Sequence, residues 1–291
     1  MTSSPHEWQI RGRTLPLDHP IVMGIVNVTP DSFSDGGQYF TPGAALAHAA
    51  RLLAEGADIL DVGGESTRPQ GAAPVTADEE LRRVLPVVKA IARERPAAVI
   101  SVDTVKASVA EGAIEAGAHI VNDVSGLRLD PEMVSVCAAA GVGVVVMHSR
   151  GDVSTMATYE HAEYDDFLDD MLAELRARVD EMERGGVRPE CIAVDPGIGF
   201  SKRPEHSLLA LACLERLAAW GYPVVVGASR KRFIGQITGS TQASRRVHGS
   251  VGAAVAAYER GANILRVHDV APTRHALDVV AAIRAAGGAR R

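Results

Sequence analysis

Carboxylate, amide and ammonium side chains stand where short apolar segments of this chain end. Asp103, Asn122 and Asp195 each follow such a segment, and Lys231 comes soon after the run 223–227. A carboxylate accepts well from two adjacent N–H groups, as on the edge of a guanidine-like heterocycle, while a lysine donates to carbonyl and ring-nitrogen acceptors. This set of groups therefore predicts a site for a polar heterocycle.

Arg266 and His268 end the last apolar segment, just before a helix expected near 272–286. Because a helix N-terminus favours negative charge, these two residues predict a phosphate site. His and Cys residues show no zinc-type spacing, whereas Asn27, together with phosphate oxygens and water, would suit Mg²⁺. The sequence contains neither a paired acid–base dyad nor a nucleophile elbow.

Each polar residue at an apolar end also has a simpler interpretation. Asp103 or Asn122 alone is more often a helix cap or turn residue, and His148 alone is more often a hydrogen-bonded structural histidine. Eight ends in succession are harder to explain as caps. The positions are Asn27, Asp61, Asp103, Asn122, His148, Asp195, Ser229 with Lys231, and Arg266 with His268.

Alternating apolar and amphipathic segments must position these residues. Strands are predicted near 21–26, 58–62, 98–102, 119–124, 142–147, 191–194, 223–227 and 262–267. Helices are predicted near 43–54, 77–93, 105–116, 130–140, 163–184, 205–219, 247–260 and 272–286. Eight strand–helix units predict an α/β fold, a single-domain (β/α)8 TIM barrel with its site at the C-terminal strand ends. A doubly wound open sheet is the alternative, but Gly197-Ile198-Gly199 lacks the third glycine of a dinucleotide motif.

Glycines recur where the expected helices turn back into strands, as in Glu55-Gly56-Ala57 and Arg260-Gly261-Ala262. Glycine adopts the left-handed conformation past a helix end at little cost. We expect residues 1–20 to be an N-terminal lead-in with a hairpin around Gly12 at the barrel floor. The barrel domain should span 21–286, and 287–291 should form a disordered tail.

Composition limits the classes of protein that fit. The chain has 291 residues, of which 46% are hydrophobic, and its net charge of −6 argues against nucleic acid as a partner. Its three cysteines (Cys137, Cys191 and Cys213) are odd in number and predict buried, reduced thiols. Since no apolar run approaches twenty residues, we expect a cytoplasmic protein without a membrane partner.

A long polar loop follows the first predicted strand, and loops of this length inside a compact domain are usually functional, although a surface Ω-loop is the simpler alternative. The stretch Gly24–Gly37 (GIVNVTPDSFSDGG) resembles the first signature of dihydropteroate synthases. Asp61–Pro69 (DVGGESTRP) resembles their second signature, and further pieces match in order to residue 270. They are SVDT at 101–104, VNDV at 121–124, MH at 147–148, DPGIGF at 195–200, GASRK at 227–231 and RVHDV at 266–270.

The resemblance implies a role for each matching residue. Asp103, Asn122, Met147, Asp195 and Lys231 should hold a pterin. Asn27, Arg266 and His268 should hold a diphosphate and, through Asn27, Mg²⁺. Phe33, Thr67, Pro69, Phe200 and Ser229 should form the p-aminobenzoate site, and the catalytic set should comprise Asn27, Asp31, Phe33, Thr67, Arg68, Lys231, Arg266 and His268.

The activity implied is condensation of 6-hydroxymethyl-7,8-dihydropterin diphosphate with p-aminobenzoate, the sulfonamide-sensitive step of folate synthesis, by a homodimer. Pterin-dependent methyltransferases resemble the same barrel but would not need the diphosphate residues or the long first loop. A non-catalytic pterin-binding relative is the third interpretation. The chain departs from the family pattern at Ser149, Val153 and Ser201, and in a second loop longer by Gln70. These departures concern loop geometry rather than the pterin or diphosphate positions.

Overall fold

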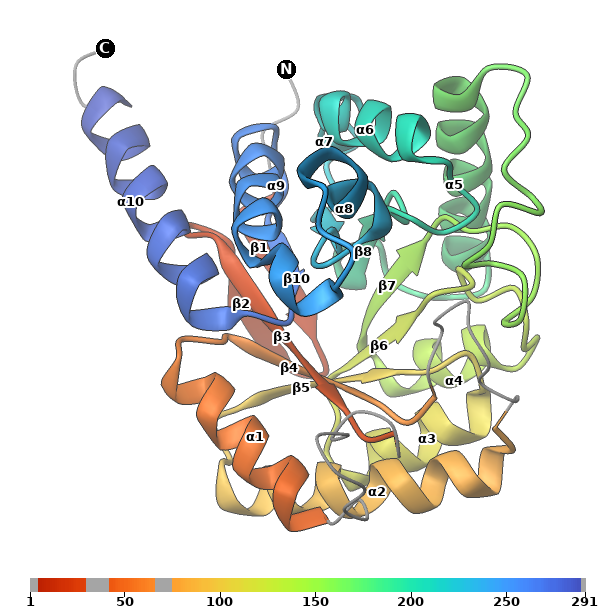
Figure 1. Ribbon diagram of the computed structural model, residues 1–291. Coiled ribbons are helices and arrows are strands. Elements are labelled where there is room, and N and C mark those ends of the chain that lie inside the picture. Colours follow the sequence, from red (N-terminus) through yellow and green to blue (C-terminus); the bar gives the residue numbers. More distant parts are fainter. Residues whose placement is uncertain (1–4, 30–41, 66–74, 289–291) are drawn as a thin grey trace.

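The computed structural model describes residues 5–29, 42–65 and 75–288. Eight parallel strands form one sheet in the order β8-β7-β6-β5-β4-β3-β10-β9, surrounded by helices (Figure 1). A parallel bridge between Val194 and Val224 joins the two ends of the sheet, so the strands close into a ring. The barrel prediction is therefore confirmed, and the open-sheet alternative is wrong. The strands are β3 (Ile21–Asn27), β4 (Ile59–Gly63), β5 (Val99–Asp103), β6 (Ile120–Asp123), β7 (Gly143–Met147), β8 (Ile192–Asp195), β9 (Val225–Val226) and β10 (Ile264–Val267).

The helices follow the expected alternation with two differences. The sixth expected helix divides at Cys213, and a short helix, α8 (Arg232–Thr238), lies where we predicted a loop. Seven residues containing Gly235 are too few to show a helical period, so contacts with the rest of the fold must stabilise α8. The others are α1 (Pro42–Ala54), α2 (Ala77–Glu94), α3 (Ala107–Ala116), α4 (Met133–Ala140), α5 (Phe167–Arg184), α6 (Pro204–Ala212), α7 (Leu214–Ala218), α9 (Val247–Glu259) and α10 (Val270–Gly288).

The ends of the elements follow local sequence signals. Thr76 caps α2 by accepting from the Glu79 amide. Asp166 caps α5, which begins four residues later than the predicted 163. α10 continues through Gly288 into the segment expected as a tail, and 289–291 lie outside the described residues. Five glycines that follow helices have positive φ, which confirms the predicted turns: Gly56, Gly117, Gly141, Gly221 and Gly261.

An N-terminal hairpin closes the floor of the barrel. β1 (Glu7–Ile10) pairs antiparallel with β2 (Arg13–Pro16) around Arg11 and Gly12, both with positive φ. Trp8 is fully buried and donates from Nε1 to the Cys191 carbonyl at 2.8 Å. A Cβ on Gly143 would lie 2.6 Å from Ile10, so this glycine permits the close approach of hairpin and strand. The expected lead-in thus belongs to the folded core.

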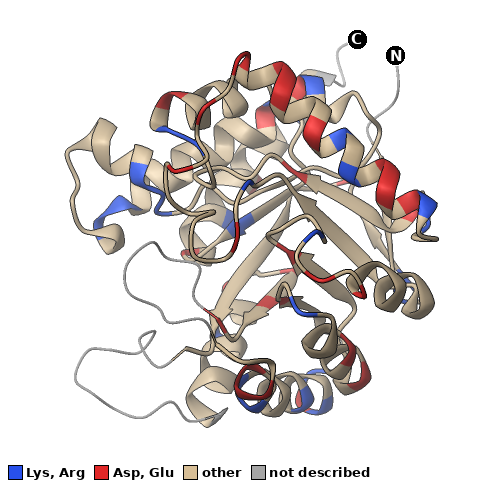
Figure 2. Ribbon diagram, turned by 90° about the vertical axis from the view of Figure 1, so that its right-hand side faces the viewer, with Lys and Arg blue, Asp and Glu red and all other residues tan. Residues whose placement is uncertain are grey.

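Alternation along the strands divides the barrel interior into two levels. The lower level is apolar and packs on the hairpin; it contains Ile21, Met23, Ile59, Ile120, Val145, Ala193, Val225 and Ile264. Two residues further along the same strands come Asp61, Asn122, Met147, Asp195 and Arg266. Because side chains two apart on a strand share a face, the polar level lies directly above the apolar one. Acidic and basic segments accordingly lie within the ring as well as on the helices (Figure 2).

No helix within the described residues is long and apolar enough to span a membrane. The three cysteines are free thiols, with Cys137 and Cys191 buried and Cys213 partly exposed. Burial raises the pKa of Cys137 to about 12, so this thiol stays protonated. The prediction of reduced cysteines, buried in two of three cases, is confirmed.

Candidate active site at the barrel mouth

An arginine between two aspartates forms the centre of the polar level. Arg266 donates from Nε to Asp61 and from Nη2 to Asp103, each at 2.6 Å, and Asn122 donates to the same Asp61 oxygen at 3.1 Å. We expected Arg266 to point toward the following helix. Instead, its guanidinium lies inside the barrel beside Asp103, a predicted pterin residue. The register explains this, since Arg266 follows Ile264 at the interval that keeps both side chains inside the barrel.

Asp61 is one of the polar residues at the strand ends, and the sequence predicts no role for it. It is fully buried, and its Oδ1 has no hydrogen-bond partner among the described residues. It stands two residues after Ile59, so the alternation along β4 could have placed it inside the barrel. Asp61 therefore joins the diphosphate residue Arg266 to the pterin residue Asn122.

The remaining predicted pterin residues surround the same mouth. Asp195 accepts from the Gly197 amide at 2.7 Å, and Met147 pairs in register with Asp195. The Lys231 ammonium lies 3.8 Å from the centre of the Phe200 ring, a cation–π contact. Met147 and Phe200 belong to one apolar cluster. Five strands thus bring a carboxylate pair, an amide, an ammonium and an apolar surface to one opening.

Burial shifts the pKa values of the charged groups toward neutrality. Burial raises the pKa of Asp195 to about 6. The hydrogen bond from the Gly197 amide and the charge of Lys231 oppose this shift. Burial and, to a smaller extent, the nearby charge of Arg266 lower the pKa of Lys231 to about 7. Burial also raises the pKa of Asp103, whereas Arg266 opposes that shift. Groups with such pKa values, gathered in one opening, are typical of a functional site.

Ser229, a predicted p-aminobenzoate residue, is in contact with His268, a predicted diphosphate residue. The Ser229 Oγ lies 3.0 Å from Nδ1 of His268 and accepts from the His268 amide at 3.2 Å. Behind them, Arg230 makes a two-pronged ion pair with Asp269 at 2.9 and 2.6 Å. This pair ties the loop after β9 to the end of β10, so the two predicted subsites share one support.

Asn27 ends β3, opposite Gly63, at the rim of the barrel. Of the other predicted site residues, Asp31, Phe33, Thr67, Arg68 and Pro69 lie outside the part of the chain that the structure describes. The described part of the chain contains no group of three or more His, Cys, Asp or Glu residues that could hold a metal ion. An amide oxygen is a hard ligand that suits Mg²⁺ when phosphate oxygens and water complete the coordination. Asn27 is thus one candidate ligand, and the magnesium site stays a prediction.

Sequence reasoning did not single out Lys202, which is 1% exposed beneath the rim. Its Nζ lies 2.7 Å from Nδ1 of His148, and the other imidazole nitrogen lies 3.1 Å from Glu174. This contact bears out the structural interpretation of His148 as a hydrogen-bonded residue. Lys202 lies in a loop, two residues after Phe200, where the sequence has no periodic pattern, so only the tertiary structure reveals its burial.

Ser201, one of the departures from the family pattern, has a φ of +46°, which favours glycine. Its hydroxyl offsets the strain: it accepts from the Arg150 amide at 3.0 Å and donates to the Arg150 carbonyl at 2.8 Å. Ser149, a second departure, donates to the Val124 carbonyl at 2.7 Å. Ser201 and Ser149 thus each add side-chain hydrogen bonds within the loops behind the site. The longer second loop at Gln70 lies outside the described residues.

Comparison with known proteins agrees with this site. The family model described as pterin binding enzyme matches residues 23–268. Dihydropteroate synthase from Bacillus subtilis is 45% identical over 250 residues, covering 86% of this chain and 84% of the relative. The solved structure of Xanthomonas albilineans dihydropteroate synthase with 4-aminobenzoic acid has a TM-score of 0.90 at 47% identity, covering 97% of this chain and 99% of the other. The same enzyme with 7,8-dihydropteroate has a TM-score of 0.86 at 44% identity, covering 96% and 99%. Fold, strand-end residues and relatives agree, and the chain belongs to the dihydropteroate synthase family of pterin-binding enzymes.

Proposed function

We propose that this chain condenses 6-hydroxymethyl-7,8-dihydropterin diphosphate with p-aminobenzoate to give 7,8-dihydropteroate and diphosphate. The observation that carries the proposal is the polar level of the barrel, where Asp103, Asn122, Asp195 and Lys231 surround one mouth in a chain of this family. Their carboxylates can accept from the pterin N–H edge, and Lys231 can donate to its carbonyl or ring nitrogen.

In the reaction, the bond between the pterin methylene and the diphosphate oxygen breaks, and its electron pair leaves with diphosphate. The p-aminobenzoate nitrogen donates its lone pair to the methylene and then loses a proton. An arylamine is already nucleophilic, so the chain needs no activating base. Its task is to orient the pterin and stabilise the departing charge.

Arg266 and His268 are our candidates for holding the diphosphate. Arg266 donates from Nε to Asp61 and from Nη2 to Asp103. A guanidinium has five N–H donors, so Nη1 can donate to a diphosphate oxygen while both ion pairs remain. Asn27 would hold Mg²⁺ together with diphosphate oxygens. When bound, the ion would neutralise charge on the leaving group.

Phe200 and Ser229, with Phe33, Thr67 and Pro69, are the proposed p-aminobenzoate residues. The Phe200 ring beside Lys231 offers an apolar surface next to a cation, which suits an aromatic carboxylate. Asp31 and Arg68 complete the proposed catalytic set. We place the activity in the cytoplasm, in keeping with the free cysteines.

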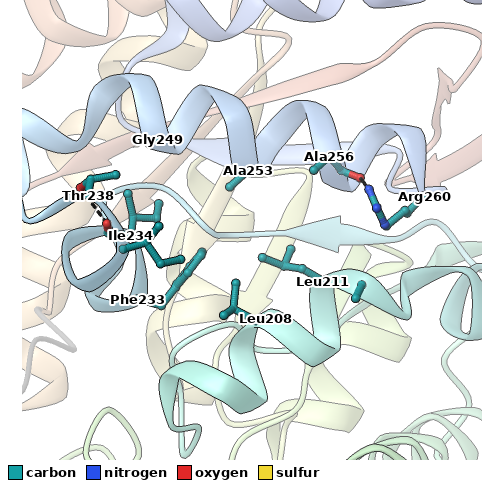
Figure 3. A pocket seen from close by; sticks show the side chains of 11 residues that line it. Leu208, Leu211, Phe233, Ile234, Thr238, Gly249, Ala253, Ala256 and Arg260 are labelled. Carbon is teal, nitrogen blue, oxygen red and sulfur yellow. Dashed lines mark hydrogen bonds between the residues drawn. The ribbon is translucent and has the colours of Figure 1, made fainter.

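We further propose a homodimer. An apolar groove of about 320 Å³ lies between α6, α8 and α9 (Figure 3). Leu208 and Ile237 line it and are 44% and 64% exposed. Gly249, Ala253 and Ala256 give α9 a smooth side along the groove, which lets another helix approach closely. A second copy of this chain, presenting the same face, is the proposed occupant.

Release of diphosphate tests the proposed function. Purified protein is given the pterin diphosphate, p-aminobenzoate and Mg²⁺, and both dihydropteroate and diphosphate are quantified. Equal amounts of both products are expected. Pterin binding without either product would instead identify a non-catalytic relative, and methyl transfer from a pterin donor would identify a methyltransferase.

A further inference from the structure

Lys202 is a buried lysine whose ammonium contacts no carboxylate among the described residues. Its Nζ lies 2.7 Å from Nδ1 of His148, 3.1 Å from the Phe200 carbonyl and 3.4 Å from the His148 carbonyl. Burying a charge is strongly unfavourable unless each polar hydrogen finds an acceptor. An ammonium has three N–H donors, and these are three acceptors. The surroundings are therefore built for the charged lysine, although burial lowers its pKa to about 7.

His148 presents the correct nitrogen to this lysine. Its Nε2 lies 3.1 Å from Glu174, and burial together with the charge of Lys202 lowers its pKa to about 4. Burial would raise the pKa of Glu174, but bonds from His148 and Arg150 lower it to about 2. A neutral imidazole with its proton on Nε2, toward the carboxylate, leaves the Nδ1 lone pair for Lys202. Donation thus runs from Lys202 through His148 to Glu174.

Lys202 joins the two loops that support the mouth. His148 directly follows β7, whose last residue is Met147, and Phe200 lies in the loop after β8, whose last residue is Asp195. These loops are pressed together, since a Cβ on Gly197 would lie 1.9 Å from the His148 carbonyl oxygen. Lys202 thus holds the backbone of Phe200 through its carbonyl, and the ring of the same residue lies 3.8 Å from the Lys231 ammonium.

We propose that Lys202 is a positioning residue for the amine acceptor: its ammonium holds the Phe200 ring beside Lys231 and thereby shapes the p-aminobenzoate subsite. The proposal rests on the proposed function. It predicts a selective effect, because the pterin carboxylates are held by other bonds, Asp195 by Gly197 and Asp103 by Arg266. A merely structural lysine would affect both substrates and the stability together.

The test compares Lys202→Met with Lys89→Met, the same replacement at an exposed position on α2. Lys202→Met should raise the KM for p-aminobenzoate about tenfold or more and change the Kd of 6-hydroxymethylpterin less than about twofold. Lys89→Met should change neither. In a Phe200→Ala background, Lys202→Met should raise that KM less than about twofold further, because its effect acts through the ring.

An unchanged KM for p-aminobenzoate, equal weakening of pterin binding, or independent effects of Lys202 and Phe200 would each overturn the proposal. If Lys202→Met fails to fold, Glu174→Ala on the surface of α5 is the second variant, because it removes the hydrogen bond to the His148 imidazole. It should raise the KM for p-aminobenzoate about threefold. An unchanged KM in this variant would count against the proposal. Crystal structures give a readout independent of activity. If the wild type forms no product, the proposed function fails, but displacement of the Phe200 ring from Lys231 in the variant still supports the positioning role. A ring that stays in place refutes it.

Discussion

Among single residues, the charged side chains at the mouth of the barrel, Asp195 and Lys231, are the groups that we expect to bind the pterin. Asp195 is buried and Lys231 is half-buried, and their pKa values move toward neutrality because desolvation by the surrounding protein disfavours their charged forms. A pterin edge that donates to the carboxylate would favour its ionised form. Binding should therefore depend on pH in a direction that the structure sets.

Asp195→Ala should abolish measurable pterin binding in a folded protein, because two charge-assisted hydrogen bonds are lost. In the wild type, pterin affinity should be full above pH 6 and fall about tenfold per unit below it, since the carboxyl pKa is raised to about 6 and the bound form is ionised. Calorimetric titration from pH 5 to 8 measures both effects. Unchanged affinity in Asp195→Ala would remove this residue from the site.

Arg266 couples the two ends of the site, because it contacts Asp103 as well as the proposed diphosphate position. Arg266→Ala should weaken diphosphate binding and, by leaving Asp61 and Asp103 without their cation, weaken pterin binding about tenfold. Arg266→Lys is the control: it keeps the charge but cannot span both carboxylates, so intermediate affinities are expected. Loss of diphosphate affinity alone would show that the contact with Asp103 does not matter for pterin.

At the scale of elements, the apolar floor and the polar mouth depend on different segments. The β1–β2 hairpin packs on the lower level through Trp8 and Ile10, while the loops after β7 and β8 support the upper level. α8 begins directly after Lys231, and Phe233 and Ile234 bury against the core. This short helix thus fixes the end of the loop that carries a pterin residue.

Trp8→Ala should lower the free energy of unfolding by about 3 to 5 kcal/mol, because it empties a buried site and removes a hydrogen bond. The KM values for both substrates should stay the same, since the floor lies a full level below the mouth. Denaturant unfolding and steady-state kinetics measure these quantities. Thr14→Ala, exposed on the same hairpin, serves as the control and should change neither.

At the scale of the whole molecule, ring closure brings distant segments into one site. Arg266 and Asp61 stand 205 positions apart in the chain yet share a hydrogen bond. The groove between α6, α8 and α9 lies on the outside of this ring, so the proposed dimer contact is separate from the mouth.

Ile237→Glu should convert the proposed dimer into monomers, because it places a charge in the apolar groove. Sedimentation velocity measures the change. Val279→Glu adds the same charge at an exposed apolar position on α10, outside the groove, and should leave the dimer intact. A wild-type monomer at micromolar concentration would contradict the proposal.

The eight strand–helix units, the glycine turns and the polar residues at the strand ends could all be predicted from the sequence. These features are local: apolar runs, caps and left-handed glycines depend on neighbours in sequence. The family signatures likewise identified Asp103, Asn122, Asp195 and Lys231, which the structure brings to one mouth.

Tertiary structure alone decided what these residues contact. Three contacts of the site join segments that are far apart in sequence: Arg266 with Asp61, Lys202 with His148, and Ser229 with His268. The helix α8 likewise depends on packing against the rest of the fold. Only closure of the ring sets such distances, and no periodic pattern encodes them. Burial also shifted the pKa values, because desolvation depends on every atom that surrounds a group rather than on its neighbours in the chain.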